Sequence, residues 1–151
     1  MTHSTDSAEQ RAIELRRRGW KQRLLGGFID VVGPLWTCKE EGGGWAYGVL
    51  IKPEHLNLAL VAHGGMLGTL IDHVLSSVAW EAAGRQRCVT VHLDTHFIAA
   101  VHCGEFVEAR GQLVRRMGSL MFMQGTVAVD GQTVLTAHAV MKAQVGAAPS
   151  G

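Results

Sequence analysis

Charge, cysteine and long apolar runs are all scarce in this chain of 151 residues. Charged residues make up 18% and the formal net charge is +1, so we expect no nucleic acid or other polyanion as partner. The three cysteines are odd in number and form no C-x-x-C pair, which favours free thiols in a reducing compartment. The sequence shows neither a signal-peptide core nor a run of roughly 18 apolar residues, the length that spans a bilayer. We therefore expect a cytoplasmic protein without a membrane partner.

Hydrophobic residues make up 47% of the chain, enough for one domain whose core needs neither disulfide nor metal. We expect an N-terminal helical segment over residues 1–32, a folded domain over 33–145 and a disordered tail over 146–151. In the first segment Ser7 is a candidate helix N-cap, and Gly19 follows a basic turn that is typical of a helix C-terminus.

For the folded domain the sequence predicts two strands, then one long apolar helix and then four strands. Residues 34–51 indicate two strands joined by three glycines, and residues 64–81 indicate the helix. The later strands are predicted over residues 88–100, 105–116, 119–130 and 133–145. Alternation over 88–100 places Val89, Val91, Leu93 and Phe97 on one face and Thr90, His92, Asp94 and His96 on the other. The prediction is an α+β fold in which an antiparallel sheet wraps around one helix that is apolar nearly all round and therefore buried.

The central helix opens on His63-Gly64-Gly65 and carries Asp72 among apolar residues. The unpaired N–H groups of a first helical turn are partly positive, and glycine lets a ligand oxygen approach the backbone closely. Asp72 needs donors or a cleft, because an isolated buried carboxylate is costly. A structural alternative stays open at this point, with glycines that permit tight packing and an aspartate bonded within the core.

Spacing adds a constraint on any chemistry that uses both ends of this motif. Gly64 and Asp72 lie eight residues apart, which is about 12 Å along a helix axis. Reacting groups must approach to within about 3–3.5 Å. If both residues act on one carbonyl group, they must come from two chains, so the sequence predicts at least a homodimer.

Two segments together resemble a known family. The pattern N-x5-HGG-x4-L-x-D is followed by a strand of the type V-[ST]-V-x-L-x-x-x-F, here Asn57, His63-Gly64-Gly65, Leu70, Asp72, Thr90 and Phe97 with their neighbours. The chain resembles hotdog-fold acyl-CoA thioesterases of the PaaI-like group, related to 4-hydroxybenzoyl-CoA thioesterases, over about residues 33–145. The resemblance implies a hotdog fold, hydrolysis of an acyl-CoA or aroyl-CoA to free acid and CoA, no metal or cofactor, and a homodimer or dimer-of-dimers tetramer.

The resemblance also implies roles for individual residues. The Gly64 amide would polarise the thioester carbonyl, and Asp72 would act as general base or nucleophile. Asn57 would hold water or the carbonyl, Thr90 would assist the acid, and His63 would be mainly structural. The further substrate-binding candidates are Gly65, Arg85, Arg87, Arg115, Arg116, Gly118 and Ser119, with the arginines near the CoA phosphates. The identity of the acyl group stays open, although the apolar loop before the helix favours an apolar or aromatic group.

The sequence departs from the family pattern at a few positions, and other functions were also considered. Leu60 stands where many members have glycine, and Ala99 and Ala100 follow Phe97 where many have a proline. The main alternative function is a non-catalytic acyl-CoA-binding or regulatory protein. A metal site on His92, Asp94 and His96 lacks a fourth ligand, and a serine or cysteine nucleophile lacks its motif.

Overall fold

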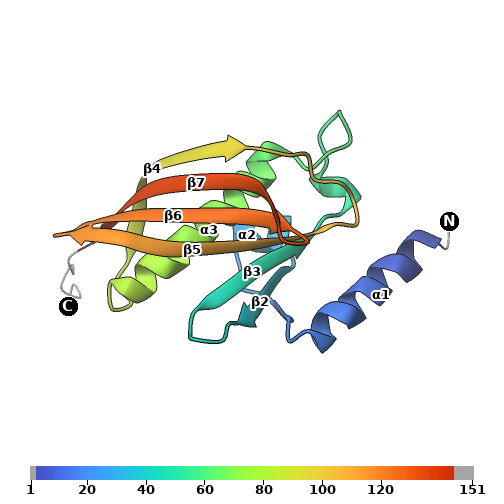
Figure 1. The fold of residues 1–151 in the computed structure, drawn as a ribbon, viewed down its shortest axis with the longest axis horizontal. Helices are drawn as coiled ribbons and strands as arrows, with labels where there is room; N and C mark the ends of the chain where they lie inside the picture. Colours follow the sequence, from blue (N-terminus) through green and yellow to red (C-terminus); the bar gives the residue numbers. More distant parts are fainter. Residues whose placement is uncertain (1–2, 145–151) are drawn as a thin grey trace.

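The structure is a computed structural model and describes residues 3–144. Seven antiparallel strands form one sheet in the order β1-β2-β3-β5-β6-β7-β4, with the long helix α3 along one of its faces (Figure 1). This arrangement confirms the predicted α+β architecture. The helices are α1 (His3–Arg17), α2 (Phe28–Val32), α3 (Gly64–Ala82) and the 3-10 helix η1 (Pro53–His55). The strands are β1 (Lys21–Arg23), β2 (Leu35–Lys39), β3 (Trp45–Leu50), β4 (Cys88–Phe97), β5 (Phe106–Met117), β6 (Leu120–Val129) and β7 (Gln132–Ala143).

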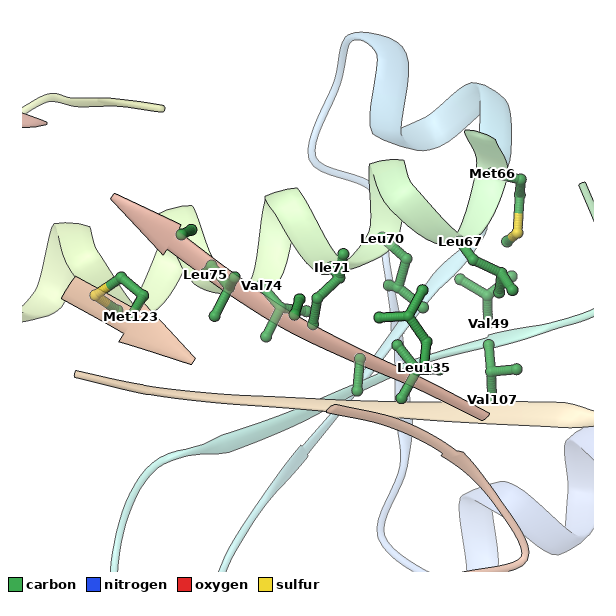
Figure 2. Close-up of a cluster of buried hydrophobic side chains, with 14 of the residues drawn as sticks. Val49, Met66, Leu67, Leu70, Ile71, Val74, Leu75, Val107, Met123 and Leu135 are labelled. Atoms are coloured by element: carbon green, nitrogen blue, oxygen red, sulfur yellow. The ribbon is translucent and has the colours of Figure 1, made fainter. Parts of the chain in front are cut away.

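The core lies between α3 and the sheet. Figure 2 shows the apolar face of the helix above strand residues such as Val49, Val107 and Leu135, all of them buried. Two paired glycines beneath the helix, Gly111 and Gly125, allow the close approach. A Cβ on Gly111 would lie 2.7 Å from Leu75 Cδ2, and one on Gly125 would lie 2.9 Å from Ile71 Cδ1. Each large apolar side chain buried in this way contributes about 1.5–3 kcal/mol. The buried helix residues are Met66, Leu67, Leu70, Ile71, Val74, Leu75 and Ala79.

The other face of α3 is only half covered, so the expectation of a helix buried all round was wrong. Asp72, His73, Ser76 and Ser77 are half-buried and Trp80 is exposed. The physical reason is that the sheet covers one side of the helix and no second layer covers the other in the described part of this single chain. Apart from Trp80, the residues of α3 that remain open are mainly polar or small.

The N-terminal region adds a second cluster on the opposite face of the sheet. Leu15 of α1 packs there with Trp20, Trp36 and Phe106. Ser7 lies inside α1 and does not cap it, because the helix already begins at His3. The residues before 33 also contribute the edge strand β1 and the short helix α2, while the tail over 146–151 falls outside the described residues. No helix within residues 3–144 is long and apolar enough to cross a membrane, and all three cysteines are free.

An irregularity in β4 changes the face on which Thr90 lies. Thr90 pairs with Met141 of β7 and His92 pairs with Val140, which leaves Val91 as an extra residue in a β-bulge. Paired residues of antiparallel strands point to the same side of a sheet. Thr90 therefore faces α3 together with Leu93 and Phe97, contrary to the prediction from simple alternation. Two residues predicted on the core face, Val89 and Val91, are exposed instead.

Candidate functional site

The first turn of α3 leaves one backbone donor open. His63 is the N-cap residue, and its Nδ1 accepts a hydrogen bond of 2.8 Å from the Gly65 N–H. The His63 carbonyl accepts bonds from the N–H groups of Met66 and Leu67. Within the described chain the Gly64 N–H has no partner. It is therefore available to a ligand oxygen, in a position where the helix N-terminus is partly positive.

This amide opens into a pocket of about 330 Å³ beside the start of α3. The ring of Phe97, at the end of β4, lies against Gly64. A Cβ on Gly64 would be 3.2 Å from both Cε1 and Cζ of that ring, closer than most side-chain contacts. The sequence analysis singled out Gly64 but missed this contact, which joins residues far apart in the chain. The other lining residues are Asn57, Val61, Ala62, Leu67, Ile98, Ala99, Ala100 and Val101.

Asn57 shapes the loop that borders this pocket. Its Oδ1 accepts hydrogen bonds from the N–H groups of Ala59 at 2.9 Å and Val61 at 3.3 Å. The Asn57 backbone N–H donates to the Val61 carbonyl at 2.8 Å, which closes the turn. Because the side-chain oxygen is occupied, the part of Asn57 that remains to meet a ligand is its amide NH2 group.

Leu60 lies in this turn with a φ of 61°, the left-handed region that favours glycine. For an L-residue this conformation costs about 1–2 kcal/mol, and Leu60 is 72% exposed, so little packing offsets the cost. Glycine itself loses roughly 0.5–1 kcal/mol in backbone entropy. We expect Leu60→Gly to raise the melting temperature by about 1–3 °C in a thermal unfolding experiment.

The neighbouring Leu58 gives the control for this prediction. It is fully exposed in the same loop and has no positive φ, so Leu58→Gly should lower the melting temperature or leave it unchanged. A lower melting temperature for Leu60→Gly would show that the leucine side chain contributes contacts that outweigh the backbone strain.

The carboxylate of Asp72 is held from β4, two turns further along α3. The Thr90 hydroxyl donates a hydrogen bond of 2.8 Å to Asp72 Oδ1. Asp72 is half-buried, and the Thr90 hydroxyl is a donor of the kind that the sequence analysis expected for this carboxylate. One carboxylate oxygen is fixed by Thr90, while the open side of α3 leaves the group accessible to a second molecule.

His73 does not form an acid–base pair with its neighbour Asp72. The His73 ring instead meets the Tyr47 ring edge-on, with centroids 6.1 Å apart. Burial lowers the pKa of His73 below its usual value, and the nearby charge of Asp72 opposes this only in part. Burial likewise raises the pKa of Tyr47. Both side chains are therefore mainly neutral at pH 7.

The basic candidates lie at the other end of α3, roughly 28 Å from Gly64 along this 19-residue helix. Arg116 donates to the carbonyl oxygens of Gly118 at 3.0 Å and Ala82 at 3.3 Å. Arg85 lies over the Trp80 ring, 5.4 Å from its centroid. Arg87 lines a second pocket, of about 520 Å³, with His73, Ser76 and Trp80 among its other walls. Arg115 is exposed on β5, and the Ser119 carbonyl accepts a bond from the Ala143 N–H.

The histidines of β4 face away from α3. His92, Asp94 and His96 pair with Val140, His138 and Thr136 on the outward side of the sheet, and all three are exposed. Among residues 3–144 no group of three or more histidine, cysteine, aspartate or glutamate side chains is arranged to hold a metal ion.

A single antiparallel sheet around one long helix is the hotdog class of α+β folds. The thioesterase superfamily matches residues 61–136, just over half of the chain, and the chain belongs to this family. The match includes His63-Gly64-Gly65, Asp72 and the whole of β4. The predicted family resemblance is thus confirmed.

Solved structures with the same fold are distant in sequence. A conserved protein from Pseudomonas aeruginosa has a TM-score of 0.72 and 18% identity, over 80% of this chain and 95% of that one. Zebra fish thioesterase superfamily member 2 has a TM-score of 0.69 and 18% identity, over 79% and 88%. A hypothetical thioesterase from Streptococcus pneumoniae TIGR4, solved with coenzyme A, has a TM-score of 0.63 and 21% identity, over 66% and 80%. None of the curated proteins compared with the chain matches it.

Proposed function

We propose that the protein hydrolyses the thioester bond of an acyl-coenzyme A to give the free acid and CoA. One observation carries this proposal. α3 presents an N–H at Gly64 that has no partner within residues 3–144 and, two turns later, a carboxylate fixed by the Thr90 hydroxyl. The first group suits a carbonyl oxygen that gains negative charge, and the second suits proton transfer or attack at the carbonyl carbon. Coenzyme A as carrier is supported by the bound ligand of the Streptococcus pneumoniae thioesterase.

The chemistry can follow two routes that use the same residues. As general base, Asp72 takes a proton from a water molecule whose oxygen attacks the thioester carbon. The carbon–sulfur bond then breaks and the CoA thiolate is protonated. As nucleophile, Asp72 attacks the carbon itself, and the carbon–sulfur bond breaks with release of the CoA thiolate. Water then hydrolyses the resulting anhydride to the free acid and restores the Asp72 carboxylate. In both routes the Gly64 N–H stabilises the oxyanion, while Thr90 orients the carboxylate.

The site requires two copies of the chain, because about 12 Å of helix separates Gly64 from Asp72. The half-covered face of α3 and the edge strand β4 are the surfaces on which a second copy can complete it. We propose a homodimer, or a tetramer made of two dimers, in which Gly64 of one chain faces Asp72 of the other. Arg85, Arg87 and Arg116 at the far end of α3 would then meet the CoA phosphates.

Mixing two inactive variants tests both the chemistry and the assembly. Purified Asp72→Asn and Gly64→Ala proteins are unfolded together, refolded together, and assayed with acyl-CoAs and a reagent for the released thiol. In random mixing about half of the dimers are mixed, and one of their two sites has both native residues. We therefore expect about one quarter of the wild-type activity to return, although each variant alone is nearly inactive.

Refolding each variant with itself provides the control and should restore no activity. If the mixture stays as inactive as its components while each variant folds normally, both residues act within one chain and the two-chain site is wrong. Saturable binding of acyl-CoA by the wild-type protein, without thiol release from any acyl-CoA offered, would instead support the non-catalytic binding protein.

A further inference from the structure

We propose that Phe97 determines the acyl specificity of the site, and that the site accepts compact, uncharged, apolar acyl groups. This inference rests on the proposed thioester hydrolysis and specifies its substrate class. The inference starts from one contact, in which the Phe97 ring lies against Gly64. The ring is therefore next to the Gly64 N–H, the only amide of the first turn of α3 without a partner in the described chain.

The polarity of the pocket beside Gly64 identifies which part of the substrate it receives. Its side chains are apolar except for Asn57, whose oxygen already accepts two backbone hydrogen bonds. No ionisable side chain lines it within residues 3–144. The pantetheine arm of CoA carries several amides, and the side chains of this pocket offer them only the NH2 group of Asn57. We therefore assign the pocket to the acyl group, and an acyl group that ends in a carboxylate meets no cationic side chain among the described residues that line it.

The size of the pocket in the single chain suits a compact acyl group. Its volume of about 330 Å³ is at the small end of the roughly 300–1,000 Å³ that is usual for ligand pockets. Phe97 stands at the rim, since it is the last residue of β4 and its side chain is 55% exposed in the single chain. Pairing with the buried Leu135 of β7 fixes the backbone of Phe97 so that its ring lies on the helix side. A carbonyl bonded to Gly64 would direct the first carbons of its acyl chain along this ring.

A series of straight-chain acyl-CoAs from acetyl to dodecanoyl, with succinyl-CoA as the charged member, tests the proposal. For the wild-type protein we expect kcat/KM to rise about fourfold with each added methylene until the pocket is full, and then to level off. Succinyl-CoA should be a far poorer substrate than butyryl-CoA. Phe97→Ala should lower kcat/KM for short chains and raise the ratio of long-chain to short-chain kcat/KM by about tenfold or more. Phe97→Trp should shift the preference toward shorter chains.

Phe122→Ala is the matched control. Phe122 is a partly exposed phenylalanine of β6 that lies beside outward-facing residues such as His92 and Asp94. It should leave the chain-length profile unchanged. A Phe97→Ala protein with the wild-type profile, or with one uniform loss for all substrates, would overturn the specificity role, and so would equal use of succinyl-CoA and butyryl-CoA. Failure of the wild-type protein to release thiol from any member would refute the proposed hydrolysis instead.

Discussion

Replacement of Asp72 by asparagine is expected to lower kcat by at least about 100-fold, the range usual for loss of a general base. Asparagine keeps the volume of the side chain, and its Oδ1 can still accept the hydrogen bond that Thr90 donates at 2.8 Å. Because Asp72 is only half-buried, the neutral amide should not disturb the packing of α3. We therefore expect a normal melting temperature together with a nearly inactive protein, measured as thiol release at saturating acyl-CoA.

Asp94→Asn is the control for the change of charge. Asp94 belongs to the same strand as Thr90 but is exposed on the outward side of the sheet, where it pairs with His138. The same chemical change there should leave kcat unchanged. Hydrolysis by Asp72→Asn at a rate near that of the wild-type protein would remove Asp72 from the mechanism.

The second large effect is expected for Gly64→Ala. The added methyl group would lie 3.2 Å from the Phe97 ring, next to the amide that is proposed to bind the carbonyl oxygen. Loss of an oxyanion donor costs roughly 2.7–4 kcal/mol, which is about 100-fold to 1,000-fold in kcat. Stability should be unchanged or slightly raised, because alanine is the better helix former and the half-exposed ring can shift. Thermal unfolding and kcat are measured on one preparation.

Gly68→Ala, one turn further along α3, is the matched control. In the single chain a Cβ at Gly68 meets no atom within 4 Å, so this variant controls for the stability effect of the exchange and should gain about 0.8–1 kcal/mol. A destabilised Gly64→Ala protein with full activity per folded molecule would show that Gly64 is needed only for packing. Gly64→Ala in the Phe97→Ala background separates the two causes of inactivity: a loss that persists there comes from the amide and not from a displaced ring.

The elements with strong local patterns were predictable from the sequence. The expected helix over residues 64–81 is α3, Gly64–Ala82, because its apolar residues repeat with helical spacing over five turns. The short elements were not predicted, because α2 has five residues and β1 has three, too few to show a helical or strand periodicity. The start of α1 was misplaced because a capping residue such as Ser7 favours a helix start without requiring one.

The sequence analysis identified Gly64 and Asp72 as candidate site residues but could not show which side chains contact them. The contact of Phe97 with Gly64 joins residues 33 positions apart, and no local pattern encodes such a contact. Thr90 was assigned to the wrong face because alternation assumes a regular strand, and β4 is irregular at Val91. An odd spacing places two residues on opposite faces of a regular strand. If Thr90 and Leu93 both face inward, their spacing of three residues therefore requires a bulge, and this spacing was the signal in the sequence.

The bulge at Val91 restricts how the length of β4 can change. Thr90 and Phe97 are seven residues apart, an odd number that would send their side chains to opposite faces of a regular strand. The extra residue brings both onto the α3 side, so one strand touches Asp72 at one end and Gly64 at the other. As long as the bulge is kept, inserting or deleting a single residue between these two positions would turn one of them outward, whereas a change of two residues would preserve their common face. In this segment the parity of the length matters more for the site than the identity of most residues within it.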